Sequence, residues 1–405
     1  MQQHSKMLWL SGVPAAVLLS FAWPWLSPIY GLILMALGMV VWGRAKLTLK
    51  HGAVFLGFLL WEVLSVFWSP YPSLGWADVV MVLPIALMGI IASQFRVPQG
   101  AEIAHRWSTV FAWSTIVAWS IIFFTSVLEN GLVHYKSFAL GGRVGVHFQS
   151  IYLIVAALIL EREIWKAKGI FRWILATAVL WLLFGVITLS SRIHLIIVPV
   201  LIMVRFAALI WEMKAHRKTL IALASATVVV LGFLVVALPG PRNRMIDLRN
   251  EIRSIDQKVD GKQTNHRIFL WKYGVELVQE STWKGLGNGA SEEFLHEKLK
   301  TCTATFYRGT TPYYLHEVKY DVHNIWLQSW LEGGVVGVLL LALLFGWGLY
   351  FSSGAVRYSW IVVLLSGTTE SVLEKQAGVF ILTFLVALTF VSGIKERREA
   401  SIHKR

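Results

Sequence analysis

Apolar runs of about 20 residues, almost free of charge, recur along most of this 405-residue chain. A run of that length is what an α-helix needs to cross the hydrocarbon core of a bilayer. Because lipid offers the backbone no hydrogen bonds, such runs fold as helices. The sequence therefore predicts an all-α, polytopic membrane protein with about 12 transmembrane helices. The candidate spans are roughly 7–23, 28–43, 52–68, 74–93, 108–128, 147–165, 171–190, 193–211, 218–238, 325–350, 357–373 and 377–394.

The composition and the placement of charge agree with this class. Only 15% of the residues are charged, whereas soluble domains carry about a quarter. A net charge of +14 would suggest nucleic acid in a soluble protein, but here Lys and Arg gather in alternate loops. The positive-inside rule places those loops, and both termini, in the cytoplasm. We expect a lipid bilayer as partner and no nucleic acid. Residues 7–23 lack a small-residue cleavage site, so we expect a first span there and not a cleaved signal peptide.

One connection is much longer than the others. Residues 239–323 are polar, follow the ninth span and fall on the outer side of the membrane. Within them, residues 267–278 carry a helical apolar stripe, and Gly285–Gly289 supplies a turn. We expect a small ordered helical domain here. The predicted organisation is nine spans in 1–238, a periplasmic loop domain in 239–323, three spans in 324–394 and a cytoplasmic tail in 395–405.

The segment from Asp321 to Gly337 leads from that loop into the tenth span. Asp321 is a suitable N-cap, which would place His323 in the first helical turn at the bilayer surface. The positive end of the helix dipole disfavours imidazolium there, so we expect a neutral ring available as a base. A histidine at a helix start is more often an interfacial or capping residue. Gly333 and Gly337 lie four apart on one face, a spacing that lets another helix backbone approach closely.

Three arginines are predicted on the outer side, where the positive-inside rule disfavours them: Arg143, Arg192 and Arg267. Each could simply snorkel or pair with a carboxylate such as Glu129, Glu370 or Glu374. Three on one face together with His323 favour an anion site, because guanidinium presents forked donors that match phosphate oxygens.

Carboxylates and metal ligands give weaker signals. Glu62 lies well inside a predicted span, where it is either functional or the buried partner of an arginine or an aromatic donor. Glu292, Glu293 and His296 form a weak metal pattern that better fits a solvated helix face. We therefore expect no metal site on the outer side and no cofactor.

The motifs carry a family resemblance. His323-Asn324 is followed after nine residues by Gly334-x-x-Gly337, Thr188-x-Ser-Ser-Arg192 stands upstream, and Arg267 leads through Trp271 into Gly285-Leu-Gly-Asn-Gly289. This pattern resembles the bacterial O-antigen ligase family of membrane glycosyltransferases, in motifs over about a quarter of the chain and in topology over nearly all of it.

The resemblance implies transfer of O-antigen polysaccharide from undecaprenyl diphosphate to a hydroxyl of lipid A-core. The reaction would take place at the periplasmic face of the inner membrane. It would be inverting, metal-independent and free of cofactors. His323 would act as general base and Arg192, Arg267 and Arg143 would hold the diphosphate, with supporting roles for Asn324 and Glu62.

Two alternatives remain open. An O-antigen polymerase or a protein O-oligosaccharyltransferase would use the same chemistry on another acceptor, although the latter usually carries a C-terminal soluble domain and only residues 395–405 follow the last span. A transporter would use Glu62 and Asp78 in a midplane pathway. The sequence leaves open the sugar, the accepting core hydroxyl and the oligomeric state.

Overall fold

A computed structural model describes residues 51–97, 99–130, 145–212, 217–256, 266–302, 305–308 and 311–393, and a few positions before residue 51. The chain divides into two compact units. Unit 1 comprises Met1–Ser114 and Gln257–Arg405, and unit 2 comprises Thr115–Asp256. The predicted first span, most of the second and the tail 395–405 lie outside the described residues.

The described residues are almost entirely helical, as predicted, with two short antiparallel strand pairs. Unit 1 holds β1 (Arg44–Ala45), α3 (Ala53–Val66), α4 (Pro72–Gln94), β2 (Phe95–Arg96), the start of α5 (Gly100–Asn130), α11 (His266–Glu280), α12 (Ser291–Leu299), β3 (Phe306–Arg308), β4 (Thr311–Tyr313), η5 (Leu315–Glu317), α13 (Ile325–Phe351), α14 (Gly354–Gly367), η6 (Val372–Glu374) and α15 (Gln376–Gly393). Unit 2 holds the end of α5, α6 (Val146–Ile164), α7 (Gly169–Leu189), α8 (Arg192–Glu212), α9 (Arg217–Ala237) and α10 (Pro239–Asp256).

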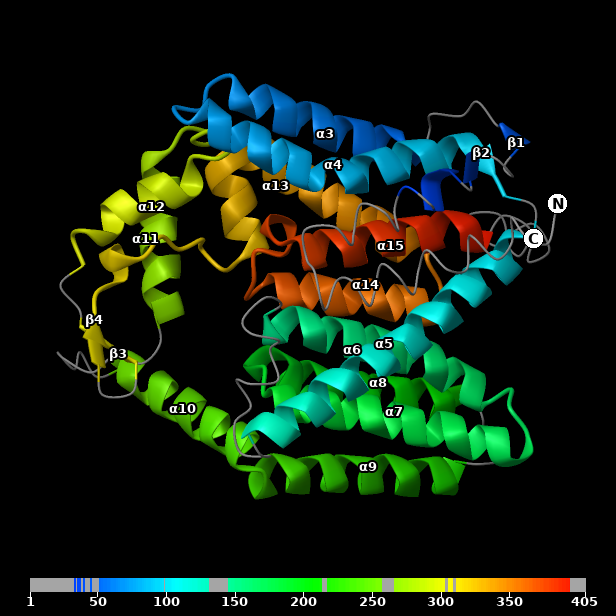
Figure 1. Cartoon of the computed structure of the whole chain (residues 1–405). Coiled ribbons are helices and arrows are strands. Elements are labelled where there is room, and N and C mark those ends of the chain that lie inside the picture. The colour runs from blue at the N-terminus through cyan, green and yellow to red at the C-terminus, as the bar shows by residue number, and fades with distance from the viewer. Residues whose placement is uncertain are drawn as a thin grey trace. The chain divides into compact units, whose positions relative to one another are not determined.

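The apolar helices of unit 1 lie side by side. The helix α4 packs against both α3 and α15, and α13 packs against α3, α14 and α15 (Figure 1). Their shared core contains large side chains such as Phe55, Phe345, Trp360 and Phe384, each at most 2% exposed. In unit 2, α6 packs against α7 and α8 against α9.

Among the described residues, four helices are long and apolar enough to cross a membrane: α4, α5, α7 and α13. The helix pair Ala224–Ala237 and Pro239–Asp247, which is bent by 85°, would be a fifth span if the two helices count as one. Ala53–Val66, Gly354–Gly367 and Gln376–Ser392 are shorter apolar helices. The chain is thus membrane-embedded and helical, and the count of 12 spans stays a prediction.

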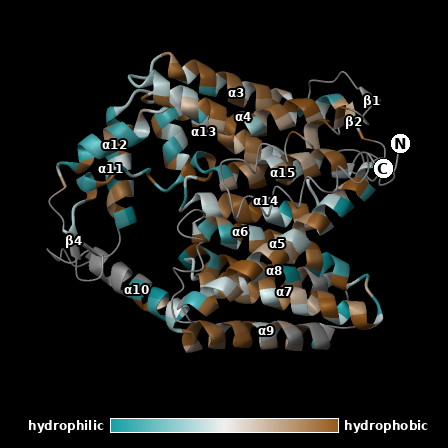
Figure 2. Ribbon diagram, viewed as in Figure 1, coloured by the Kyte–Doolittle hydropathy of each residue, from teal (hydrophilic) through white to brown (hydrophobic). Residues whose placement is uncertain are grey.

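The polar connection 239–323 is ordered where the structure describes it. The predicted stripe at 267–278 forms α11, which is partly hydrophilic and partly hydrophobic, whereas α12 is largely hydrophilic (Figure 2). A small core joins α11, α12, β3, η5 and the start of α13; its buried residues are Leu270, Leu277, Leu295, Leu299, Cys302, Phe306, Leu315, Val322 and Leu331. This core fixes the chain on both sides of His323, because Val322 before it and Leu331 after it are fully buried within the core.

Candidate active site

The helix α13 begins one turn later than the sequence suggests. Its N-cap is Asn324, whose Oδ1 accepts hydrogen bonds from the backbone N–H groups of Trp326 and Leu327 at 3.0 and 3.1 Å. Asn324 Nδ2 also donates to the carbonyl of Thr368 at 3.1 Å, which ties the helix start to the end of α14. The prediction that Asp321 caps this helix is therefore wrong. His323 lies before the cap and not in the first turn, with a left-handed backbone of φ 48°.

Two carboxylates surround the His323 ring. Asp321 accepts the backbone N–H of His323 at 2.7 Å, and the same oxygen lies 2.7 Å from His323 Nδ1. A Glu370 oxygen lies 3.5 Å from Nδ1. Burial alone lowers the pKa of His323, but the hydrogen bonds and charges of Asp321 and Glu370 outweigh it and raise the pKa to about 9. The expectation of a neutral ring is wrong, because these carboxylates outweigh the helix dipole.

Arg267 and Lys375 complete the histidine cluster, which we define as Asp321, His323, Glu370, Arg267 and Lys375. Arg267, at the second position of α11, forms an ion pair with Glu370. Lys375 Nζ lies 3.3 Å from the second oxygen of Asp321. Burial raises the pKa of Asp321, but hydrogen bonding and charge from His323 hold it below its usual value. Arg267 and His323 thus contact the same carboxylate. The pairing of Arg267 with Glu370 is the alternative to an anion site that the sequence left open, and the role of Arg267 on a diphosphate stays a prediction.

The glycine turn after α11 positions the next part of the site. The helix α13 is interrupted at Gly334, where φ is 61°, and the turn docks onto this break. The backbone N–H groups of Leu286 and Gly287 donate to the carbonyls of Leu331 and Glu332, and that of Val335 donates to the carbonyl of Trp283. The sequence predicts that another helix backbone approaches Gly333 and Gly337. At Gly333 the neighbour is instead a side chain, the Trp61 indole of α3, which donates to the Gly333 carbonyl at 2.8 Å. The backbone that approaches closely is the glycine turn, and it does so at Gly334.

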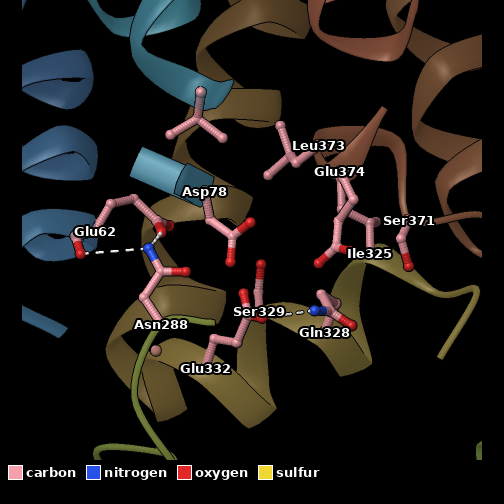
Figure 3. A pocket seen from close by; sticks show the side chains of 12 residues that line it. Glu62, Asp78, Asn288, Ile325, Gln328, Ser329, Glu332, Ser371, Leu373 and Glu374 are labelled. Atoms are coloured by element: carbon pink, nitrogen blue, oxygen red, sulfur yellow. Dashed lines mark hydrogen bonds between the residues drawn. The ribbon is translucent and has the colours of Figure 1, made fainter. Parts of the chain in front are cut away.

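An acidic chamber lies in unit 1, lined by residues from α3, α4, the glycine turn, α13 and η6 (Figure 3). Its carboxylates are those of Glu62, Asp78, Glu332 and Glu374. Ser371 lines the chamber and its hydroxyl donates to Asp321 at 3.3 Å, so the chamber adjoins the histidine cluster. Glu62 itself accepts a hydrogen bond from Asn288 Nδ2 at 2.9 Å, so its partner is an amide from the glycine turn.

A group of three carboxylates, which the sequence did not predict, lies beside the acidic chamber and shares Glu374 with it. Carboxylate oxygens of Glu292, Asp321 and Glu374 lie within 4.8 Å of one another. Glu292 therefore faces other carboxylates and is not simply solvated; burial first, and then the charge of Asp321, raise its pKa. Asp321 is already engaged by His323 and Lys375, so we assign it to the histidine cluster. Sequence reasoning missed the cluster because its members come from separate segments.

Arg192 belongs to unit 2, where it is the first residue of α8. The connection before it is tight: Ser190 has a left-handed φ of 55°, and the Ser191 hydroxyl lies 2.9 Å from His147 Nδ1 and 2.7 Å from His194 Nδ1. Arg192 is 3.9 Å from Asp247 of α10, and its side chain is 26% exposed. Its convergence with His323 stays a prediction. Arg143 lies outside the described residues.

These features define a helical membrane protein with a polar, histidine-centred site at the head of an apolar helix. Residues 177–342 match the model of the family described as O-antigen ligase, which confirms the family resemblance. The matched segment includes Arg192, Arg267 and His323. A search of curated proteins found no match to this chain.

Proposed function

We propose that the protein is an O-antigen ligase. It would transfer O-antigen polysaccharide from undecaprenyl diphosphate to a hydroxyl of lipid A-core, at the periplasmic face of the inner membrane. The observation that carries the proposal is the histidine cluster, because it joins a partly buried histidine, two carboxylates and an arginine. Arg267, Asp321 and His323 of this cluster lie within the family's matched segment. Both termini would be cytoplasmic, and the 239–323 loop would face the periplasm.

His323 is the proposed general base. Its Nδ1 faces Asp321, so a neutral ring would keep its proton on Nδ1 and present the Nε2 lone pair. A carboxylate on the opposite nitrogen orients a catalytic imidazole in this way and stabilises the imidazolium that forms. Since the pKa is about 9, only about one ring in a hundred is neutral at pH 7, but that ring is a strong base.

The proposed reaction is a direct displacement. Nε2 of His323 takes the proton of the acceptor hydroxyl, and the hydroxyl oxygen forms a bond to the anomeric carbon of the donor sugar. The bond from that carbon to the diphosphate oxygen breaks, and undecaprenyl diphosphate leaves with the electron pair. A single displacement inverts the anomeric centre. Arg267, Arg192 and Arg143 would stabilise the charge on the departing diphosphate, so the reacting phosphates need no metal ion. Asn324 and Glu62 would hold the surrounding backbone.

Reconstitution tests the proposal. Purified protein in lipid nanodiscs is given undecaprenyl diphosphate-linked O-antigen and lipid A-core, and products are resolved by gel electrophoresis. We expect polymer on lipid A-core with the wild-type protein. The His323→Ala protein should produce none, at equal protein concentration.

Two other outcomes identify the alternatives. Elongation of one lipid-linked chain by another would make the protein a polymerase, and transfer to a peptide hydroxyl would make it a protein O-oligosaccharyltransferase. The absence of transfer to any acceptor would contradict the whole proposal and would favour the transporter alternative.

A further inference from the structure

The acidic chamber contains many acceptors of hydrogen bonds and positive charge. Glu62, Asp78, Glu332 and Glu374 contribute carboxylates to it. Within the part of the chain that the structure describes, no lysine or arginine forms an ion pair with Glu62, Asp78 or Glu332. The nearby Lys375 is directed at Asp321, although its charge also acts on Glu374 and Asp78. The chamber therefore gathers four carboxyl groups around one space, with Lys375 as the nearest cation.

Two buried amide oxygens add further hydrogen-bond acceptors to the chamber. Asn288 is fully buried and Gln328 is 5% exposed, and both line the acidic chamber. Their nitrogens are used: Asn288 Nδ2 donates to Glu62, and Gln328 Nε2 donates to Glu332 at 2.7 Å. Among the described residues, neither Asn288 Oδ1 nor Gln328 Oε1 has a hydrogen-bond partner. Figure 3 shows the Asn288 amide oxygen turned into the space between the carboxylates.

A buried oxygen without a donor is costly, and several carboxylates facing one space repel one another. Water or a sugar hydroxyl would satisfy the amide oxygens but would leave the charge uncompensated. A cation does both. Carboxylate and amide oxygens are hard ligands, which suit Mg²⁺ and Ca²⁺ and not the softer metals that prefer sulfur or imidazole.

We propose that the acidic chamber binds a hydrated divalent cation, with Mg²⁺ as the preferred ion. The carboxylates lie around one shared space (Figure 3), and Mg²⁺ retains several of its waters in protein sites. The carboxylates would then hold the ion largely through its waters, and the amide oxygens would accept hydrogen bonds from them.

Such a cation would stabilise the packing beside the histidine cluster. Its ligating groups come from α3, α4, the glycine turn, α13 and η6, which are distant in sequence. Glu374 directly precedes Lys375, and Ser371 contacts Asp321. The cation is separate from the diphosphate chemistry, so the inference stands whether or not the protein is a ligase.

Metal binding and thermal stability test the inference directly. The full chain, purified in detergent, is stripped with EDTA, desalted and titrated with MgCl₂ or CaCl₂ at constant ionic strength. Bound metal is counted by mass spectrometry after gel filtration, and Tm is followed in parallel. We expect about one bound divalent ion per chain and a rise in Tm of about 3–8 °C at saturation. The inference would be overturned if no ion is bound and Tm does not change at concentrations of either salt up to about 10 mM.

Variants distinguish metal binding in the acidic chamber from metal binding to surface carboxylates. Glu332→Gln and Asp78→Asn should each weaken Mg²⁺ binding at least about tenfold, because each removes one carboxylate from the chamber. Asn288→Asp should act in the opposite sense, because it adds a carboxylate to the chamber. Its Tm after EDTA treatment should be lower than that of the wild type, and the rise in Tm caused by Mg²⁺ should be larger. Glu297→Gln, which removes an exposed carboxylate paired with Lys300, is the matched control and should bind as the wild type does. Equal binding by all four variants would place the ion elsewhere and contradict the inference.

Discussion

At the scale of single residues, the position of His323 determines what its ring can do. It faces Asp321 and Glu370, and Arg267, Lys375 and the His266 ring lie around the same group. An imidazole held between carboxylates is mostly protonated at neutral pH, and its neutral form is a stronger base than ordinary histidine. Transfer that depends on the neutral form must therefore increase as the pH rises towards 9.

The pH dependence of transfer tests this assignment. We expect the wild-type rate to rise about tenfold per pH unit below its midpoint near 9. Asp321→Asn removes the closer negative charge, so imidazolium is less favoured, the pKa of His323 falls and the rising limb moves to lower pH. The midpoint is the readout, because the maximal rate can also fall when ring orientation is lost. A midpoint unchanged in Asp321→Asn would show that Asp321 does not set the basicity of the active group.

Removal of the ring should abolish chemistry without unfolding the protein. We expect His323→Ala to lose about two to four orders of magnitude in transfer rate, the usual contribution of a general base. His323→Asn is the matched variant, because asparagine tolerates the left-handed φ of 48° better than alanine does. Both should remain monodisperse in gel filtration. Loss of folded protein in both variants would instead give His323 a structural role.

Sequence reasoning located His323 but not its surroundings. It could find the His323-Asn324 pair and the unusual Arg267. It named Asp321 as the cap, whereas Asn324 provides it. It named Glu370 only as a possible partner of an arginine and not of His323, because Glu370 is 47 positions away along the chain and reaches Nδ1 only through the packing of α13 and α14. The error in protonation state follows from that missing contact.

At the scale of elements, the docking of the glycine turn onto α13 is the central local feature. The turn was predicted, but its partner was not, because the break at Gly334 is visible only when both segments are seen together. This docking brings Asn288 to Glu62. Single carboxylates of the acidic chamber, such as Glu62, could likewise be found in the sequence. Their convergence could not, because only the packing of five elements places them around one space.

Alanine substitutions within one helix test the docking. A Cβ at Gly334 would lie 2.0 Å from the Trp283 carbonyl oxygen, and the backbone there has a positive φ. We expect Gly334→Ala to lower the free energy of unfolding by at least about 2 kcal/mol, seen as a lower Tm. Gly346→Ala, where a Cβ meets nothing within 4 Å, is the control and should be neutral or slightly stabilising. Similar Tm values for the two variants would show that the turn does not dock as described.

At the scale of the whole molecule, the proposed reaction requires residues from both compact units. His323 and Arg267 belong to unit 1, whereas Arg192 belongs to unit 2. The sequence assigned all three to one outer face from topology alone. That assignment and the count of 12 spans remain predictions, since four helices among the described residues meet the length and composition of a span, or five with the bent pair.

Arg192 gives the test at this scale. If its guanidinium holds the diphosphate with a forked pair of donors, lysine keeps the charge but not the geometry. We therefore expect Arg192→Lys to reduce transfer nearly as much as Arg192→Ala, with protein levels unchanged. The same pair of substitutions at Arg267 and Arg143 would rank the three arginines, and we expect Arg143 to be the most tolerant. Wild-type transfer by Arg192→Lys would remove Arg192 from the diphosphate site, since a snorkelling cation needs only a long stem and a charge.

The most direct test of the central claim is the lipopolysaccharide of a native host from which this gene is deleted, resolved on a gel. We predict core lipid without O-chain, with polymer accumulating on undecaprenyl diphosphate. Complementation with the wild-type gene should restore the O-chain, and the His323→Ala gene should not. Core lipid that carries one repeat unit would instead identify a polymerase, and unchanged lipopolysaccharide in the deletion strain would contradict the assignment to O-antigen transfer.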